Sequence, residues 1–592
     1  MMIGWRALVR LFALFLVVAE WTAGAEDFAV SGSLRKWEPV RIDFDGPEAT
    51  VTDNEPNPFL DYRLQVEFTS PSGNRVSVPG FFDGDGAGGV SGSVWRVYFS
   101  PDETGKWAFK AQFRKGPEIA VSLEAEAGEA TAFDGAAGAF DVAAQDPEAP
   151  GFYRWGRLEY AGGHYLKFRD GGYWLKGGTD SPEDFLAYAG FSNTPRAKYR
   201  FESHVPDWRE GDPDWGDGKG KAIIGALNYL ASVKVNSIYF LPMNIGGDGK
   251  NVWPYVGPID GKGGEGNDNL HFDVAKLREW GIVFEHAQRQ GILLHFVLNE
   301  AEENNKRELD DAAFGVERKL YYRELVARFA HLPALQWNLC EEYNLNIELA
   351  PDMVKECAQY FRDVDPYDHP VTVHHAGKVE EAWAPFLADP RFQVTSFQTN
   401  ETDIVEVWRK QSREAGFPQV IGMDEFFPDY ANAENAGRHR REYIWPVYLS
   451  GGQLEFIYNE KDDSEDFRNY EPHWRYMAYA RTFMEEHLPF WEMEPNDALL
   501  TGASEFQGEH NLVKAQVFAK EGECYAIYLP VATETGTFDL SGAQGEFVQR
   551  WYNPRAGEFA GTETRVSGGG PVELGAPPSD PAEDWVVVLV RP

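Results

Sequence analysis

The stretch from Leu293 to Leu339 contains one complete unit of the fold. It begins with the apolar run Leu293-Leu294-His295-Phe296-Val297-Leu298, continues through an amphipathic helical pattern at Val316–Phe329, and ends with a second run, Leu335-Gln336-Trp337-Asn338-Leu339. A buried strand, a helix and another buried strand in this order are typical of a parallel sheet, because parallel neighbours need a long crossover connection. We therefore expect a parallel sheet here.

The same alternation extends from about residue 151 to about residue 490. Its strand candidates are Tyr173–Gly177, Ser237–Leu241, Leu293–Leu298, Leu335–Leu339, Val371–His374, Val394–Phe397, Val420–Met423 and Leu454–Ile457. Further helical patterns occupy Ala222–Val233, Asp273–Gln290 and Pro351–Arg362. This number of repeats, without a glycine-rich phosphate-binding fingerprint after the first strand, favours a (β/α)8 TIM barrel over a doubly wound open sheet.

Shorter strands flank the predicted barrel on both sides. Residues 26–145 alternate apolar and polar positions in runs such as Tyr62–Phe68 and Trp95–Phe99, separated by Gly, Pro and Asp turns. The pattern returns over 495–592 and ends in Trp585–Val590. Short strands bounded by turn residues are typical of antiparallel sandwiches. We predict a multidomain chain with an N-terminal β-sandwich, a catalytic barrel at 151–490 and a C-terminal β-sandwich.

The first 25 residues differ from the rest of the chain. Arg6 and Arg10 precede an apolar run from Leu11 to Ala19, and Ala23-Gly24-Ala25 places small residues at the −3 and −1 positions of a cut. This order is that of a secretory signal peptide, and the run is too short to span a bilayer. We expect cleavage after Ala25 and a secreted or periplasmic protein without membrane insertion.

The overall charge narrows the range of partners. The chain of 592 residues carries a net charge of −39, which disfavours nucleic acid and anionic membranes because both would be repelled. It also means that a polyanionic substrate would need a local basic patch. The three cysteines, Cys340, Cys357 and Cys524, are too few and too widely spaced for a disulfide-stapled scaffold.

Acidic residues follow two of the predicted barrel strands directly. The fourth strand runs into Glu341-Glu342-Tyr343-Asn344, and the seventh runs into Asp424-Glu425-Phe426. In a TIM barrel the residues just beyond the strand ends form the active site, and strands four and seven lie on opposite sides of its mouth. Glycoside hydrolysis needs two carboxyl groups that flank the scissile bond. The sequence therefore predicts a glycosidase site here.

The stretch Trp337-Asn338-Leu339-Cys340-Glu341-Glu342-Tyr343-Asn344 resembles the strand-four motif of clan A glycoside hydrolases, W-x-x-x-N-E-Y/P. The resemblance places Glu342 at the acid/base position, with Glu341 in place of the usual Asn and as the alternative acid. Likewise, Pro418–Phe426 resembles the strand-seven pattern of the clan. This implies Glu425 as nucleophile, Asp424 as the fallback, and a retaining double displacement.

The order of domains resembles that of bacterial proteins with a DUF5060-type N-terminal sandwich, an apiosidase-like, DUF4038-type barrel and a C-terminal domain of the collagen-binding type. The N-terminal part of the resemblance rests on Trp37-Glu38-Pro39-Val40, Asn57-Pro58-Phe59 and Phe99–Trp107. The apiosidase-type motif carries Gly-Asp where this chain has Glu341-Glu342. The resemblance therefore implies the architecture and does not carry over the substrate.

Other polar residues at strand ends, together with two tryptophans, are candidates for binding the sugar. They are Asp180, Asn244, Trp253, Asn299, Glu300, His374, His375, Gln398, Asn400, Trp445, Tyr458 and Glu460. Acidic residues near Glu300–Glu303 and Asp462–Asp466 admit Ca²⁺, but we favour solvated loops as their explanation. His374-His375 lacks the helical i,i+4 spacing of a zinc protease. We therefore expect no catalytic metal and no cofactor.

Three functions remain in competition. The first is a secreted retaining glycoside hydrolase acting on a plant or algal polysaccharide or oligosaccharide. The second is a catalytically inactive carbohydrate-binding or adhesion protein, which the presence of both motif carboxylates disfavours. The third, a protease, has no metal motif, no G-x-S-x-G elbow and no Cys–His pair in the sequence to support it.

Overall fold

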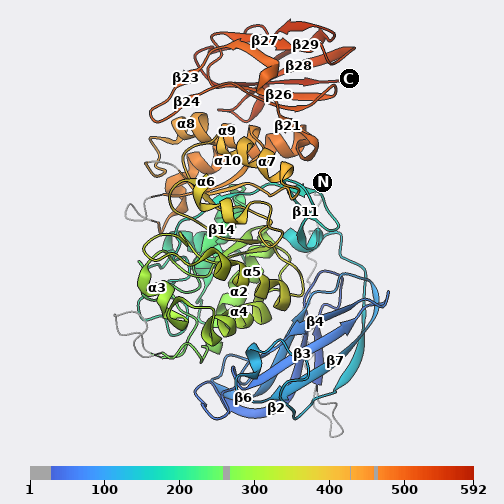
Figure 1. The fold of residues 1–592 in the computed structure, drawn as a ribbon, viewed down its shortest axis with the longest axis vertical. Coiled ribbons are helices and arrows are strands. Elements are labelled where there is room, and N and C mark those ends of the chain that lie inside the picture. The colour runs from blue at the N-terminus through green and yellow to red at the C-terminus, as the bar shows by residue number, and fades with distance from the viewer. Residues whose placement is uncertain (1–27, 258–266, 427–428, 459–463) are drawn as a thin grey trace, which may run out of the picture.

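The computed structural model describes residues 28–257, 267–426, 429–458 and 464–592. Three bodies follow one another along its longest axis in Figure 1: an N-terminal sandwich in blue, a central barrel and a C-terminal sandwich in red. The predicted signal peptide and Glu460 lie outside the described residues. The residues at which one body gives way to the next remain sequence predictions.

The central body is a parallel barrel whose strands follow one another in sequence order. The strands are β13 (Gly177–Thr179), β14 (Ser237–Phe240), β15 (Leu293–Val297), β16 (Leu335–Asn338), β17 (Val371–Thr372), β18 (Phe397–Gln398), β19 (Gly422–Glu425) and β20 (Gln453–Phe456). The sheet runs β17-β16-β15-β14-β13-β20-β19-β18. A parallel bridge between His374 and Ser396 joins β17 to β18 and closes the ring. The expected TIM-type barrel is confirmed.

The first barrel strand differs from its prediction. Tyr173 and Trp174 form β12 (Tyr173–Trp174), which pairs antiparallel with β11 (Leu166–Phe168) in a small sheet beside β10 (Leu158–Tyr160). The barrel strand β13 is instead built on Gly177 and Gly178. A side chain at Gly178 would collide with the backbone of Ser237 on β14. Because close approach demands glycine here, this strand carries no apolar signal in the sequence.

Helices cover the outside of the barrel strands. They are α1 (Lys221–Ser232), α2 (Val274–Gln290), α3 (Glu303–Glu308), α4 (Val316–Phe329), α5 (Pro351–Val364), α6 (Val379–Ala382), α7 (Ile404–Glu414), α8 (Ala436–His439), α9 (Trp445–Leu449) and α10 (Glu471–His487), with a π-helix, η6, at Arg440–Ile444. The Asp273 side chain caps α2 by accepting from the N–H of Lys276, and Gly291 ends it in a left-handed conformation. The predicted helix at Val316–Phe329 is confirmed.

The N-terminal body consists of two antiparallel sheets. Its strands are β1 (Phe28–Gly32), β2 (Val40–Thr50), β3 (Tyr62–Thr69), β4 (Arg75–Pro79), β5 (Phe81–Phe82), β6 (Ser91–Phe99), β7 (Gly105–Lys115), β8 (Glu129–Ala130) and β9 (Ala137–Val142). One sheet has the order β1-β2-β6-β5 and the other β4-β3-β7-β8, with β9 on β7. The buried Arg323 of α4 donates to the carbonyls of Leu64 and Gly80, which ties this body to the barrel.

The C-terminal body is a second antiparallel sandwich. Its strands are β21 (Glu494–Pro495), β22 (Leu500–Ala503), β23 (Phe506–Gln507), β24 (Leu512–Val513), β25 (Gln516–Lys520), β26 (Cys524–Leu529), β27 (Thr535–Asp539), β28 (Glu546–Asn553), β29 (Glu558–Ser567), β30 (Pro571–Glu573) and β31 (Trp585–Val590). Arg440 makes two hydrogen bonds, 3.0 and 2.7 Å long, to the fully buried Asp584. This bidentate pair fixes the body to η6 of the barrel.

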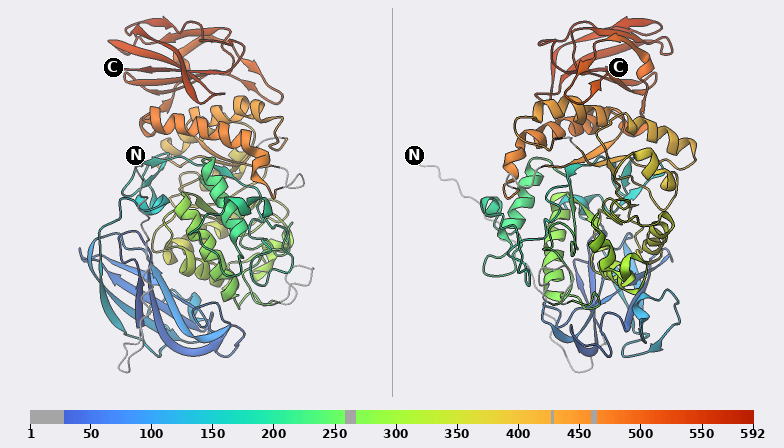
Figure 2. Two further views of the ribbon diagram at one scale, coloured as in Figure 1. Left: turned by 180° about the vertical axis from the view of Figure 1, so that it is seen from behind. Right: turned by 60° about the vertical axis from the view of Figure 1, so that its left-hand side comes forward.

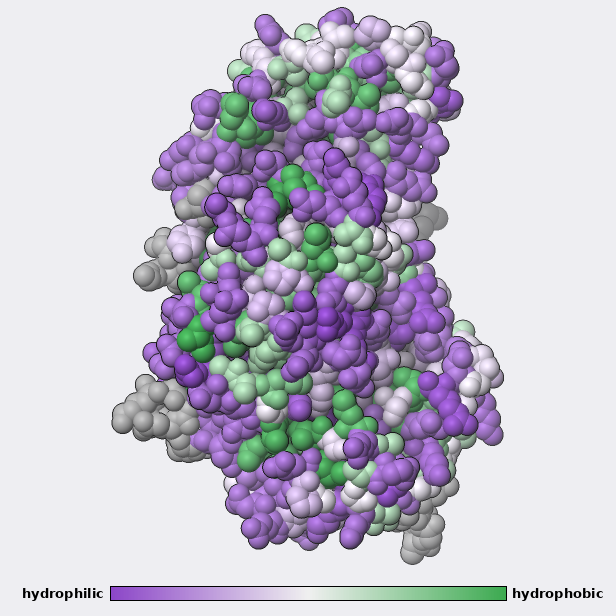
Figure 3. Space-filling model, in the orientation of Figure 1, coloured by the Kyte–Doolittle hydropathy of each residue, from purple (hydrophilic) through white to green (hydrophobic). Residues whose placement is uncertain are grey.

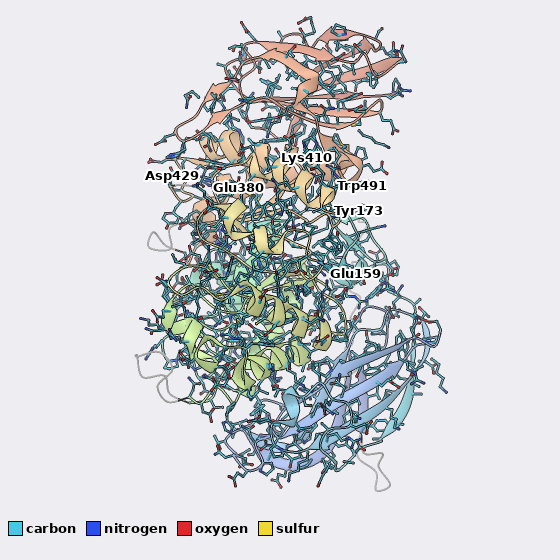
Figure 4. The ribbon with its side chains drawn as sticks, viewed as in Figure 1. Glu159, Tyr173, Glu380, Lys410, Asp429 and Trp491 are labelled. Atoms are coloured by element: carbon cyan, nitrogen blue, oxygen red, sulfur yellow. The ribbon has the colours of Figure 1, made fainter. Side chains whose placement is uncertain are left out.

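The face of the molecule seen in Figure 3 is largely hydrophilic, with scattered apolar residues. Both views in Figure 2 show the barrel helices lying between the two sandwiches. At the small sheet, Tyr173 stacks on the half-exposed Trp491, with ring centroids 5.3 Å apart, and both are labelled at the right of Figure 4. Across the described ranges, no helix combines the length and the apolar character needed to cross a membrane.

Candidate active site

Two acidic side chains from strands four and seven lie within electrostatic reach of each other at the barrel mouth. Glu425 is the last residue of β19, and its neighbour in register on β18 is Gln398. Glu341 follows β16, and its N–H donates to the carbonyl of Asn299 beyond β15 at 2.8 Å. The charge of Glu425 acts on the carboxyl of Glu341. The two groups therefore share one electrostatic environment.

Glu425 is held in its ionised form by its neighbours. His374 Nε2 lies 3.1 Å from Glu425 Oε2, and Gln398 supplies a second side-chain hydrogen bond. Burial raises the pKa of Glu425, but these hydrogen bonds and the charge of His374 outweigh it, so that the pKa falls below its ordinary value. A buried carboxylate that stays ionised is suited to attack an anomeric carbon.

Glu341 has the opposite character. Its side chain is buried, and burial is the largest cause of a pKa well above the ordinary value. The charges of Glu300 and Glu425 raise the pKa further. A carboxyl group with a raised pKa keeps its proton near neutral pH and is able to donate it to a leaving oxygen. The two carboxyls thus divide into an acid and an ionised partner.

Glu342, the residue that the motif alignment favours as acid, lies in a loop that the Lys306 side chain restrains. Its backbone has a left-handed φ of 37°, which is uncommon for a residue other than glycine. The buried Lys306 donates to the carbonyls of Glu342, Leu345 and Ile347 at 2.6–3.1 Å and so fixes this turn. The charge of Glu342 acts on Lys306 and on the neighbouring Glu341.

Further carboxyl groups from strand one surround the pair. Asp180 directly follows β13; it is 1% exposed, and its Oδ1 accepts from the Ser181 hydroxyl at 3.0 Å. Among the residues that the structure describes, its Oδ2 has no hydrogen-bond partner. Burial, then the charges of Glu425 and Glu183, hold the pKa of Asp180 well above its ordinary value. Tyr239 of β14 lies among the same groups, since Glu341, Glu183, Glu425 and Asp180 all act on its hydroxyl.

Strands two and three add another buried acid and two amides that belong to the framework. Glu300 accepts from the N–H of Asp248 at 2.9 Å, and burial followed by the charges of Glu302 and Glu183 raises its pKa well above the ordinary value. Asn299 is bonded to Arg318 and Asn305. Asn244 accepts from two backbone N–H groups of its own loop. Both amides therefore support loops through protein contacts.

Asp424, the fallback nucleophile, belongs to a buried network below the mouth. Its carboxylate is fully buried and bonded to Lys176, whose Nζ also lies 3.1 Å from Glu455. His295 Nδ1 donates to Glu455 at 2.8 Å. The His295, Asp424 and Glu455 atoms lie within 4.8 Å of one another, a spacing that metal ligands adopt. The Lys176 ammonium already binds both carboxylates, so a metal ion would have to displace it.

Some of the remaining polar candidates lie close to Gln398 and Glu425, and others lie farther from these two residues. His375 Nε2 accepts from the N–H of Gln398 at 3.3 Å, and burial lowers the pKa of His375 to about 3, which keeps the ring neutral. Asn400 lies farther along the same loop and contacts the C-terminal body through Asn511. Tyr458 follows β20 and stacks on Tyr470, with centroids 3.9 Å apart.

The two predicted stacking tryptophans are packed inside the protein. Trp253 is 2% exposed and lies under the ammonium of Lys276, 4.8 Å from the ring centroid. Trp445 is fully buried in α9 and stacks on Tyr528 of the C-terminal body at 6.0 Å. The structure therefore does not bring Trp445 to the barrel mouth. Large aromatic side chains serve cores and interfaces as readily as they serve sugar faces.

The prediction from sequence omitted Glu183, Tyr239 and Lys176. Tyr239 was detectable, because alternation along Ser237–Phe240 points every second residue into the barrel. Glu183 lies beyond the end of β13, and its place beside Glu341 depends on the loop conformation. Lys176 precedes β13 and acquires its role only when β19 and β20 lie beside that strand.

Two family models match the flanking regions of the chain. Residues 33–114 match a domain of unknown function, DUF5060. Residues 503–590 match the family described as "Putative collagen-binding domain of a collagenase". No curated protein matches the chain in sequence. The sequence resemblance noted for both flanking domains is thus confirmed.

Solved structures share the fold at low sequence identity. A "putative glycoside hydrolase" from Bacteroides vulgatus matches with a TM-score of 0.64 and 15% identity, over 94% of this chain and 99% of that one. A glycoside hydrolase family 5 protein from the same organism matches with a TM-score of 0.53 and 13% identity, over 74% and 94%. The chain therefore joins two segments that match these domain families to a central barrel with the fold of glycoside hydrolases.

Proposed function

We propose that this protein is a secreted retaining glycoside hydrolase that acts on a plant or algal polysaccharide or oligosaccharide. The observation that supports the proposal best is the pairing of Glu341 and Glu425, whose pKa values are shifted in opposite directions at the mouth of one barrel. Two carboxyl groups with divided protonation states are what glycosidic cleavage requires. The fold shared with glycoside hydrolases supports the same reaction class.

In the proposed mechanism Glu425 attacks the anomeric carbon and Glu341 protonates the leaving oxygen. The C–O bond to the leaving group breaks as the bond from the Glu425 oxygen forms, which gives a glycosyl-enzyme. Glu425 loses its charge in this step, and Glu341, now deprotonated, takes a proton from the incoming water. Attack of that water releases the sugar with its original anomeric configuration and restores both groups.

We assign the acid/base role to Glu341 in preference to Glu342. The charge of Glu425 acts on Glu341, and burial is the largest cause of the raised pKa that suits Glu341 to carry the proton. Glu342 is only partly buried, in the turn whose carbonyl Lys306 binds. The resemblance to the clan motif favours Glu342 instead. The two assignments predict opposite effects of substituting Glu341 and Glu342, so one series of variants separates them.

The deciding experiment is incubation of the purified mature protein with a panel of plant and algal polysaccharides, followed by chromatography of released sugars. We expect release by the wild type and a loss of at least about 100-fold for Glu425→Gln and Glu341→Gln. Glu342→Gln is the matched control and stays within about tenfold of wild type. The reverse result for Glu341→Gln and Glu342→Gln would transfer the acid role to Glu342.

The retaining mechanism has its own test. Azide should restore turnover of Glu425→Ala on an activated aryl glycoside and yield a glycosyl azide of inverted configuration, because the small anion takes the place of the missing nucleophile. Binding of glycans without release by wild type and all variants would instead support the inactive carbohydrate-binding protein.

A further inference from the structure

The C-terminal body reaches the barrel mouth through one hairpin. Strands β23 and β24 pair as Phe506 with Val513 and Gln507 with Leu512, and the turn between them closes with a 2.9 Å hydrogen bond from Gly508 N to Asn511 O. Figure 1 shows both strands at the edge of the red domain, above α8. The hairpin thus extends away from the sandwich toward the loops that carry the site.

The first contact of the hairpin is with the loop after strand six. Asn511 Nδ2 donates to the carbonyl of Asn400 at 3.0 Å. Asn400 closely follows Gln398, which neighbours Glu425 in the register of β18 and β19, helps to lower the pKa of Glu425, and donates its N–H to His375. A single side chain of the C-terminal body therefore holds the backbone next to a direct partner of the proposed nucleophile.

The second contact is with the segment after strand seven. Glu509 N donates to the buried Glu442 at 3.1 Å, and Glu509 Oε2 lies 3.4 Å from Arg438 Nε. Arg438 in turn binds Asp429, the residue labelled at the left of Figure 4, and His439 Nε2 lies 2.9 Å from the same carboxylate. The Arg441 guanidinium packs 4.5 Å from the Phe506 ring centroid.

We propose that the β23–β24 hairpin is a positioning element of the active site, which holds the loop carrying Gln398 and so keeps Glu425 in place. The C-terminal body is then part of the catalytic unit in addition to any binding role of its own. The link to catalysis rests on the proposed function, whereas the link to loop order does not. Asn511 is the positioning residue, since it acts on Glu425 only through the Asn400 loop.

Hydrogen–deuterium exchange of the full-length protein tests the positioning without any substrate. Asn511→Ala should increase exchange of the amides at 399–403 by about fivefold, because one hydrogen bond that restrains this loop is lost. Asn511→Asp should do the same, since it sets a carboxylate oxygen against the Asn400 carbonyl. Asn496→Ala is the matched control, because it removes an exposed amide contact to Glu521 within the same body. Unchanged exchange at 399–403 in both Asn511 variants would overturn the proposal.

The pH profile of kcat/KM tests the link to Glu425. A looser Gln398 weakens one of the hydrogen bonds that lower the pKa of Glu425, so the acidic limb should move to higher pH in Asn511→Ala and stay in place in Asn496→Ala. An unmoved acidic limb would overturn this link. If the wild type releases no sugar but exchange rises as expected, the glycosidase assignment fails while the positioning role stands.

Discussion

His374 Nε2 lies 3.1 Å from Glu425 Oε2, and the opposite ring nitrogen, Nδ1, lies 3.0 Å from the hydroxyl of Ser396. A carboxylate only accepts hydrogen bonds, so Nε2 carries a proton that it donates to Glu425. The same histidine bridges β17 and β18 where the barrel closes. The residue whose backbone bridge closes the barrel therefore also orients the proposed nucleophile through its side chain.

Replacing His374 by Phe should shift the acidic limb of the kcat/KM profile. The folded-state pKa of Glu425 lies below its ordinary value partly because of His374, so removing the donor raises that pKa. Because Glu425 has to be ionised to attack, activity at pH 5 should fall more than activity at pH 7. His487→Phe, at the exposed end of α10, should leave the limb where it is. Equal losses at both pH values would contradict the role given to His374.

Replacing Glu300 by Gln should move the basic limb in the opposite sense. The negative charge of Glu300 helps to raise the pKa of Glu341, so its removal lowers that pKa and Glu341 loses its proton at a lower pH. The pH range of maximal kcat/KM should therefore become narrower on its alkaline side. Glu303→Gln removes an exposed carboxylate paired with Arg307 and serves as the control. If the basic limb of the kcat/KM profile stays fixed in Glu300→Gln, Glu300 does not influence the pKa of Glu341.

The carboxyl groups around the pair should exclude acidic sugars. Glu425 stays ionised in a buried site, and the side chains near it, Asp180, Glu183 and Glu300, are acidic, so a uronate or sulfate bound there would meet a like charge. We expect neutral oligosaccharides to be cleaved at least about tenfold faster than the corresponding uronides, which is the effect of about 1.4 kcal/mol of repulsion. Comparison of kcat/KM on matched galactosides and galacturonides measures this. A preference for the uronide would show that a cation compensates these charges.

Breaking the pair of Arg440 and Asp584 should uncouple the C-terminal body from the barrel. Arg440→Met leaves the fully buried Asp584 without its bidentate partner, at a cost of about 3 kcal/mol in the free energy of unfolding. Urea unfolding followed by tryptophan fluorescence should then show the C-terminal body unfolding first. Arg550→Met breaks a solvent-exposed pair with Glu563 and should cost less than about 1 kcal/mol. A single transition with unchanged midpoint in Arg440→Met would refute the coupling.

Much of the fold was predictable because its strands and helices produce regular patterns of apolar and polar residues along short stretches of the sequence. Strand β15 and helix α4 follow from apolar runs and helical periodicity, and Glu425 is a candidate because it lies at the end of a buried strand. The first barrel strand was misplaced for a physical reason: Gly177 and Gly178 pack by having no side chain, which leaves no apolar signal.

The sequence by itself determined the barrel, the flanking sandwiches and the two strand ends that bear the acids. Only the tertiary structure decided that Glu341 lies beside Glu425, that Trp445 belongs to an interface, and that Asn511 reaches the Asn400 loop. Strand and helix patterns arise from neighbours in the chain, which the sequence displays directly. A pKa, a stacking partner or a contact between bodies arises from groups far apart in the chain, and these meet only when the barrel closes.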